Sequence, residues 1–285
     1  MMVITRARTH YWRVLKQRPS AVFGVVCVVV MGLAVILAPL IAPFDPNVKS
    51  GMAWLAPNWR HLSGTNDIGI DLFSELLYAG RVSLFVGIVA ASIVTVTGSV
   101  IGTISGYFGG RIDEVLMRVT DVVLTLPRLP LMLVIAAYLG SGLWSIIFVI
   151  ALVGWTSLAR QIRSQVLSVR ESSFVESSRS IGAQSAHIMV RTILPSMAGI
   201  IVANGVMEIM FAILTEAGLS FLGLGDPTHE SWGVMLYFAQ SQGAFLRGAW
   251  WWIFPPGLCI ALFCLSFNLI GTAVNDLFGL KIGRR

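Results

Sequence analysis

The sequence predicts an all-α, polytopic membrane protein, and three observations support this class. Of the 285 residues, 56% are apolar and only 12% are charged, whereas soluble domains carry about 25% charged residues. The apolar residues form six runs, most of them long enough to cross a hydrocarbon core of about 30 Å at about 1.5 Å per residue. The Lys and Arg residues concentrate in every second link between these runs.

The first expected span covers residues 21–41 and follows a basic tail at residues 1–20. This uncharged run is 21 residues long, whereas the apolar part of a cleaved signal peptide has about 7–15 residues. We therefore expect a retained span. The extracytoplasmic connection 42–81 follows, with a short separate helix expected at residues 71–77.

Five further spans are expected in a core membrane domain, residues 82–279, before a cytoplasmic tail at 280–285. The second span is rich in Gly, Ser and Thr, which allow close helix approach. The third is expected to break at Arg128, between Pro127 and Pro130. Pro255 and Pro256 indicate that regular helix begins only there in the sixth span. The five spans are expected at residues 82–107, 121–139, 143–158, 195–217 and 250–270.

The distribution of Lys and Arg predicts the orientation. Fifteen of the twenty lie in the two tails and the even-numbered links, four lie in the odd-numbered links, and Arg128 lies within a span. Cytoplasmic loops carry an excess of these residues. Both termini and the polar link 159–194 are therefore expected in the cytoplasm.

A helical pattern occupies residues 176–190 of that link. One stripe of apolar and small residues predicts a short, weakly amphipathic helix. Pro195 then opens the fifth span, a position that suits proline. Such a helix lies on lipid headgroups or docks into a partner protein, and the pattern leaves both alternatives open. The stripe consists of Phe174, Ser178, Ile181, Ser185 and Ile188.

This link resembles the EAA loop of binding-protein-dependent ABC importer permeases. The family pattern is Glu-Ala-Ala, three residues, Gly, nine residues, then Ile-x-Leu-Pro. Ser177 and Ser178 replace the two alanines, and Thr192 stands at the first Ile. The residues that carry the resemblance are Glu176, Ser177, Ser178, Gly182, Ile193, Leu194 and Pro195.

Three other stretches resemble the dipeptide, oligopeptide and nickel subfamily, C-type subunit. Residues 61–84 resemble the stretch that leads into the second span, residues 218–236 resemble an LSFLGLG…WG-x-ML stretch, and residues 267–271 resemble a terminal FNL-x-G. The resemblance implies a type I ABC importer permease fold with six transmembrane helices and a cytoplasmic coupling helix in the loop 159–194.

The resemblance also implies a function and partners. The chain is expected to be the permease subunit of an importer for di- or oligopeptides or a related small solute in a bacterial-type cytoplasmic membrane. Its implied partners are a second related permease, two ATPase subunits or domains that bind ATP and Mg, and an extracytoplasmic solute-binding protein. Glu176 would make polar contacts with the ATPase, Gly182 would allow a bend or close approach, and Pro195 would fix the entry of the fifth span.

Two carboxylates in the fifth span are candidates for the translocation path. Glu208 and Glu216 are eight residues apart, so they point about 80° apart on a helix. They either line the path and contact a peptide amine, or Glu216 sits at the outer rim and Glu208 pairs with another subunit. Arg128 is expected to face a partner or a wet cavity, in a structural role.

Other activities find no support in the sequence. It has no G-x-x-x-x-G-K-[ST] motif for ATP, and no nucleophile–base pair, so no enzyme activity is expected. Cys27, Cys259 and Cys264 lie in apolar runs, and the four histidines are scattered, so no metal site or cofactor is expected. The net charge of +6 gives no reason to invoke nucleic acid. A self-contained secondary transporter or channel remains the alternative function, although such a transporter often shows internal repeats.

Overall fold

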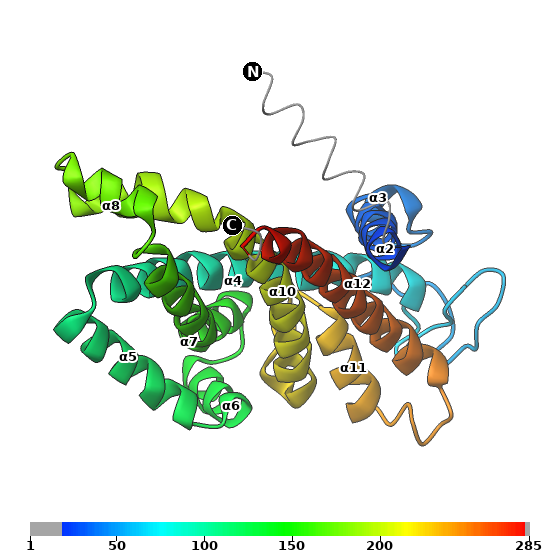
Figure 1. The fold of residues 1–285 in the computed structure, drawn as a ribbon. Coiled ribbons are helices and arrows are strands. Elements are labelled where there is room, and N and C mark those ends of the chain that lie inside the picture. The colour runs from blue at the N-terminus through cyan, green and yellow to red at the C-terminus, as the bar shows by residue number, and fades with distance from the viewer. Residues whose placement is uncertain (1–18, 283–285) are drawn as a thin grey trace.

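The computed structural model describes residues 19–282, with side chains as far as residue 277. Its regular elements are all helices, and the described residues contain no β-strand, only an isolated bridge between Thr65 and Asp71. The expected N-terminal basic residues and the side chains of Lys281, Arg284 and Arg285 lie outside the described part. The elements are α2 (Pro19–Ile36), α3 (Ala38–Ile41), α4 (Leu72–Phe108), α5 (Gly110–Thr125), α6 (Arg128–Leu139), α7 (Leu143–Val169), α8 (Ser173–Ser180), α9 (Ser185–His187), the π-helix η1 (Ile188–Ile193), α10 (Leu194–Leu219), the π-helix η2 (Ser220–Leu224), α11 (Trp232–Ser241) and α12 (Trp250–Ile282) (Figure 1).

The structure confirms the all-helical membrane class. Five elements are long and apolar enough to cross a membrane: α2, α4, α7, the continuous run Ser185–Leu224, and α12 as far as Leu277. A sixth crossing exists only if α5 and α6, which are bent by 91° at their junction, count as one broken span. The count of six spans therefore stays a prediction.

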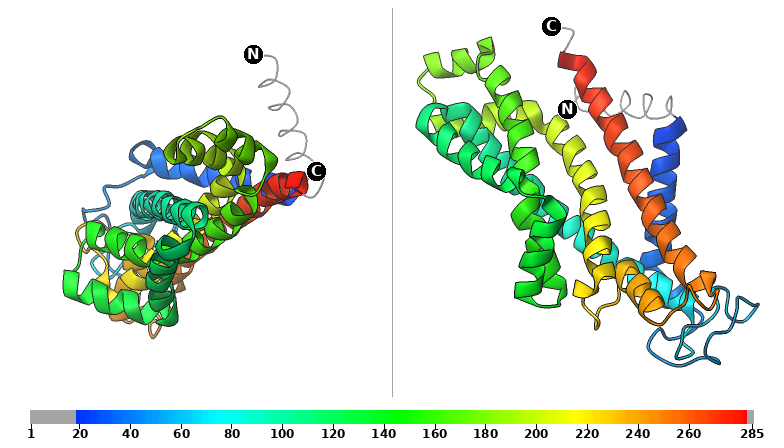
Figure 2. Two further views of the ribbon diagram at one scale, coloured as in Figure 1. Left: turned by 60° about the vertical axis from the view of Figure 1, so that its left-hand side comes forward. Right: turned by 90° about the horizontal axis from the view of Figure 1, so that it is seen from below.

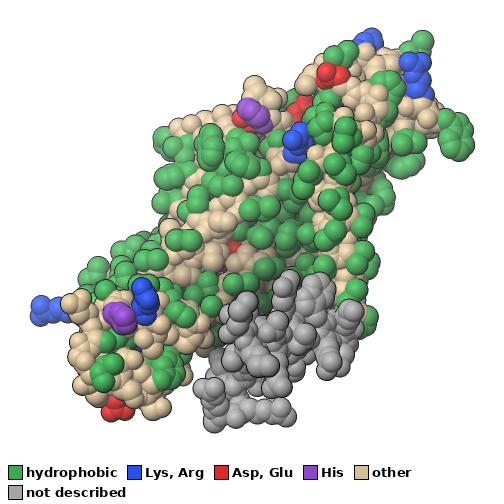
Figure 3. Space-filling view, turned by 90° about the horizontal axis from the view of Figure 1, so that it is seen from above, with side chains coloured by type: hydrophobic (Ala, Val, Ile, Leu, Met, Phe, Trp, Pro, Cys, Tyr) green, Lys and Arg blue, Asp and Glu red, His purple; other side chains and the backbone are tan. Residues whose placement is uncertain are grey.

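The long helices place the connecting segments at two opposite ends of the molecule. In the right panel of Figure 2, α8, the start of α2 and the last turns of α12 lie at one end. The segment between α3 and α4 lies at the other end, with the start of α12. On the face in Figure 3, charged side chains gather towards these two ends, and the band between them is mainly hydrophobic. This distribution suits a membrane-spanning body.

Three helix boundaries differ from those that the sequence predicts. The prediction of a separate helix at residues 71–77 is wrong, because α4 runs unbroken from Leu72. Asp71 caps this helix: its Oδ2 accepts a hydrogen bond from the Ser74 amide at 2.9 Å. The charged link 108–120 is mostly helix α5. Helix α12 begins at Trp250, and its prolines lie in the second turn. The break near Arg128 is confirmed: α5 ends at Thr125, and Pro127 caps α6.

Helices α4 and α7 pack closely through three glycines spaced by four residues. A Cβ added at Gly98 would lie 3.0 Å from the Trp155 oxygen, one at Gly102 2.5 Å from the Ala159 oxygen, and one at Gly106 2.9 Å from the Arg163 oxygen. Side chains here would push the two backbones apart. The expected close approach of the second span is therefore confirmed, and it fixes the position of the end that carries α8.

Candidate functional site

Helix α8 is a short helix held on the ends of α4 and α7 by few contacts. Val175 is its one buried residue and packs in a cluster with Tyr107, Val166 and Ile188. The Arg179 guanidinium lies 5.3 Å from the centroid of the Tyr107 ring, a cation–π distance. The rest of the α8 surface is open to a partner.

The predicted stripe is only partly covered within this chain. Phe174 is 43% exposed and Ile181 is 85% exposed, whereas Ile188 is buried. The side of a short helix that is buried depends on its neighbours, and here α4 and α7 meet α8 through Val175, which lies outside the stripe. Packing of the stripe on lipid or on a partner therefore stays a prediction.

The single helix predicted over residues 176–190 is interrupted at Gly182. Its φ is +79°, a left-handed conformation that glycine adopts without strain. The Ala183 amide donates to the Ser178 oxygen at 3.1 Å, and the Gly182 amide donates to the Arg179 oxygen at 2.9 Å. These bonds end α8 as glycine caps commonly do. No other atom of the described chain lies within 4 Å of a Cβ added at Gly182, so the bend is present but a close approach within the chain is not.

The motif residues divide between surface and core. Glu176 and Ser177 are exposed, and Ser178 is half-buried. Ile193 is fully buried and packs in the cluster of Val175, whereas Leu194 is half-buried and Pro195 is exposed. The Ile-Leu-Pro part therefore anchors the link to the membrane body, and the Glu-Ser-Ser part faces outwards.

Pro195 lies in the first turn of α10, as the sequence predicts, but the helix does not begin there. The π-helix Ile188–Ile193 joins α9 to α10 without a break. A proline lacks the amide needed for the α-helical bond to the residue four earlier. The wide turn of a π-helix directly before the proline accommodates this missing bond.

An ion-pair network ties three helix ends together beside α8. Arg163 of α7 donates through Nε and Nη2 to the two carboxylate oxygens of Asp113 of α5, both at 2.5 Å. The Ser105 hydroxyl of α4 donates to the same carboxylate. Arg170 donates from Nη1 to the Gly106 oxygen at 3.0 Å. The sequence did not reveal this network, because its members are separated by up to 64 residues.

Glu216 lies in a buried hydrogen-bonded cluster near the C-terminal end of α10. Its side chain is 1% exposed. Its carboxylate accepts from the hydroxyls of Ser231 at 2.6 Å, Ser220 at 2.8 Å and Ser83 at 3.3 Å. The Trp232 amide donates to the Ser83 hydroxyl at 3.1 Å. Glu216 therefore joins α4, α10 and the start of α11. Ser220 is four residues from Glu216, but Ser231 and Ser83 are 15 and 133 residues away, so the cluster could not be identified from the sequence.

Glu208 and Arg128 are half-buried charges without a direct partner in the described chain. Neither has a hydrogen bond or an ion pair there, and the Arg128 Nε is buried and unpartnered. The Arg128 guanidinium packs beside Gly154 of α7 and acts electrostatically on the Glu208 carboxylate. Glu216, in contrast, is hydrogen-bonded within its own serine cluster.

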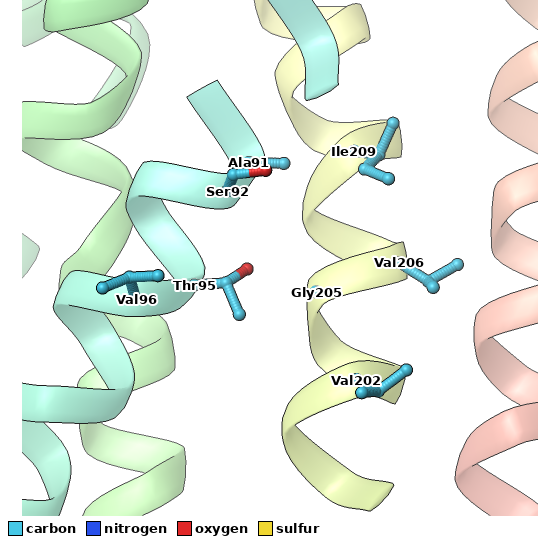
Figure 4. Close-up of a pocket in the computed structure, with 8 residues that line it drawn as sticks. All are labelled: Ala91, Ser92, Thr95, Val96, Val202, Gly205, Val206 and Ile209. Atoms are coloured by element: carbon cyan, nitrogen blue, oxygen red, sulfur yellow. The ribbon is translucent and has the colours of Figure 1, made fainter. Parts of the chain in front are cut away.

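An open groove of about 310 Å³ lies between α4 and α10 (Figure 4). In Figure 4 the Thr95 side chain of α4 points towards Gly205 of α10, and the Thr95 Oγ1 has no hydrogen-bond partner. Its lining is almost wholly apolar, with Thr95 and Ser92 as the polar exceptions. The lining residues are Ala91, Ser92, Thr95, Val96, Val202, Gly205, Val206 and Ile209.

No group of three or more potential metal ligands exists among the described residues. Cys27, Cys259 and Cys264 are free thiols.

Comparison with known proteins gives a consistent result. A family model described as the binding-protein-dependent transport system inner membrane component matches residues 98–284. A second model, the N-terminal TM domain of oligopeptide transport permease C, matches residues 9–58.

Whole proteins match along most of their length. A Brucella suis protein that carries the name of a peptide permease is 40% identical over 264 residues, which cover 92% of this chain and 87% of the relative. The dipeptide transport system permease of Bacillus subtilis is 34% identical, covering 96% of this chain and 85% of the relative. The oligopeptide transport system permease of the same organism is 33% identical, covering 92% and 86%.

Proposed function

Because the chain belongs to the family of binding-protein-dependent transport system inner membrane components, we propose that it is the transmembrane permease subunit of an ATP-driven ABC importer. Its cargo is a di- or oligopeptide or a related small solute. The names of the relatives support this cargo, since dipeptide and oligopeptide permeases match more than nine-tenths of the chain.

The observation that carries the proposal is the exposed surface of α8. Glu176 and Ser177 are open to solvent, and Gly182 has empty space around it. In the proposal, α8 seats in a cleft of an ATPase subunit, and closure of two ATPases on ATP moves the membrane helices. Ile193, Leu194 and Pro195 transmit that motion because they join the link to α10. The equilibrium between two conformations is then biased by ATP bound to another chain.

The proposal includes an orientation and a set of partners. The end with α8 and both chain termini faces the cytoplasm, as the excess of Lys and Arg indicates. A solute-binding protein docks at the opposite end, and a second related permease completes the translocation path. ATP and Mg bind only to the ATPase subunits. In this chain, Glu208 is the candidate for the path, and the buried Glu216 holds the outer end together.

Co-purification tests the proposal directly. The chain is co-expressed with the permease and ATPase genes that neighbour its own, and the complex is isolated through a tag on this chain. Gly182→Trp and Glu176→Lys should lose the ATPase, because they alter the exposed surface of α8 and of the bend that ends it. Gly243→Trp is the matched control: Gly243 also has a positive φ, +72°, and open space around it, but it lies outside the link 159–194. It should retain the ATPase.

Uptake into proteoliposomes separates the two function classes. The complex with its binding protein should import peptide only when ATP is supplied on the side of the ATPase. Peptide uptake by this chain alone, without ATP, would instead establish the self-contained transporter or channel.

A further inference from the structure

Two opposite charges lie near the middle of membrane-spanning helices. Glu208 is 14 residues after the first residue of α10 and 11 before its last. The Arg128 guanidinium lies beside Gly154, with Nη2 3.3 Å from a Cβ added there, and Gly154 is 11 residues into α7. Charges at this depth are costly, and they mark a substrate route or a polar partner.

Both charges retain unused bonding capacity. Arg128 is near enough to Glu208 to act on it electrostatically, yet the two form no ion pair within 4.0 Å in the described structure. The Arg128 Nε is buried without a partner, and Glu208 has none either. A guanidinium has five donors and a carboxylate has two acceptor oxygens. A ligand that carries both an anion and a cation would satisfy them.

The groove between α4 and α10 lies on the helix that carries Glu208 and on the helix that meets Gly154, next to Arg128. Val94 of α4 contacts Gly154, where the Arg128 guanidinium packs, and the next residue, Thr95, lines the groove. On the other wall, Gly205 lines the groove, and Glu208 follows three residues later on the same helix. The unpartnered Thr95 hydroxyl faces Gly205 (Figure 4). The two helices that form this apolar groove, with its one free hydroxyl, are thus the ones next to the charges, while the groove lining itself contains neither Arg128 nor Glu208.

We propose that Arg128 and Glu208 form a dipolar site that binds the two charged termini of a zwitterionic peptide. The Arg128 guanidinium binds the terminal carboxylate, for which its planar fork is suited. The Glu208 carboxylate binds the terminal ammonium, and the apolar groove takes the residues between them without selecting their side chains. This inference rests on the proposed function, and it adds a recognition step within the membrane to the one that a binding protein supplies.

The test is equilibrium binding of three peptides to the purified permease–ATPase complex, without the binding protein. The probes are trialanine, N-acetyl-trialanine and trialanine amide. The unmodified complex should bind trialanine at least about tenfold more tightly than either blocked peptide, which is the effect of one charge-assisted hydrogen bond. Arg128→Gln should abolish discrimination against the amide only. Glu208→Gln should abolish discrimination against the N-acetyl peptide only.

The control is Thr215→Val on the same helix, because the exposed Thr215 hydroxyl bonds only its own helix, at the Phe211 oxygen. It should keep both preferences. The inference is overturned if the unmodified complex binds all three peptides equally, or if each variant weakens all three by one factor. It is also overturned if each single variant weakens the binding of all three peptides and the charge-swapped double variant, Arg128→Glu with Glu208→Arg, restores that binding. Such a result would mean that the two residues form an internal ion pair. A complex that imports no peptide rejects the proposed function instead.

Discussion

The Arg163 guanidinium of α7 donates hydrogen bonds to both carboxylate oxygens of Asp113 of α5, and this pair joins two helices at the end of the molecule that carries α8. The paired arrangement is geometrically demanding, since a planar guanidinium and a carboxylate must lie edge to edge. The same carboxylate accepts the Ser105 hydroxyl of α4. Three helix ends thus meet at one side chain.

Loss of either partner in this pair should destabilise the complex. Asp113→Asn or Arg163→Gln should lower the free energy of unfolding by about 2 kcal/mol, because each leaves a partly buried charge without its partner. The double variant should cost less than the sum of the two by about 1 kcal/mol or more. Denaturant unfolding of the unmodified protein, the two single variants and the double variant measures this coupling. Strictly additive losses would mean that the pair contributes nothing beyond its separate members.

Gly102 should tolerate no side chain. A Cβ there would lie 2.5 Å from the Ala159 oxygen, so Gly102→Leu must separate α4 from α7. We expect a loss of about 3 kcal/mol or a failure to assemble. Gly32→Leu on α2 is the control, because nothing lies within 4 Å of its added Cβ. Thermal unfolding in detergent compares the two, and equal melting temperatures would contradict the packing described.

Replacing Glu216 should lower the free energy of unfolding. Glu216→Ala removes the acceptor of three serine hydroxyls in a buried site, and should cost about 2–4 kcal/mol. Glu208→Ala on the same helix should cost less than about 1 kcal/mol, because no hydrogen-bond donor would be left without its acceptor. Unfolding of both variants under the same conditions measures the contrast. A larger loss for Glu208 would reverse the roles assigned to the two carboxylates.

Glu230 should make stability depend on pH. Burial raises the pKa of this carboxyl above its ordinary value, and a hydrogen bond with the Glu75 carboxyl opposes the shift in part. The folded state therefore holds the proton more tightly than the unfolded state, and stability falls as pH rises above about 4.3, towards the raised pKa. Glu230→Gln imitates the protonated form and removes this loss.

The melting temperature of Glu230→Gln should therefore exceed that of the unmodified protein at pH 8, and the difference should shrink towards pH 5. Glu114→Gln alters an exposed carboxyl on α5 and serves as the control, with no such trend. A difference that stays constant over this range would show that Glu230 does not titrate with folding.

Local sequence signals predicted the membrane class and the break before Arg128, because apolar runs and prolines act over a few residues. They did not predict that α4 continues through Gly80. This glycine lies against Trp232 and Val35, within 2.7 Å of a Cβ added there, and contacts from distant residues hold the helix together. The prolines of α12 likewise suggested a later start, but the turn before them is helical and contains Trp252, which is buried in a core cluster with Phe263.

The motif on the α8 link was readable because its spacing is fixed along the chain. Its exposed glutamate and its glycine bend occur where the pattern places them. The buried side of α8 was not readable, because it depends on how Tyr107 and Val166 approach it. The serines around Glu216 and the Asp113–Arg163 pair were also hidden, since distant residues reveal their proximity only after folding.

The π-helix before Pro195 makes residues Ser185–Leu224 one continuous run of 40 residues, about 60 Å long at the helical rise. From Ser185 to Leu222 every residue is helical, and the run ends in a kink at Gly223. In the proposed mechanism, a tilt applied to α8 at one face of the membrane would reach the other face along this one helix, whose far end is attached through the Glu216 cluster.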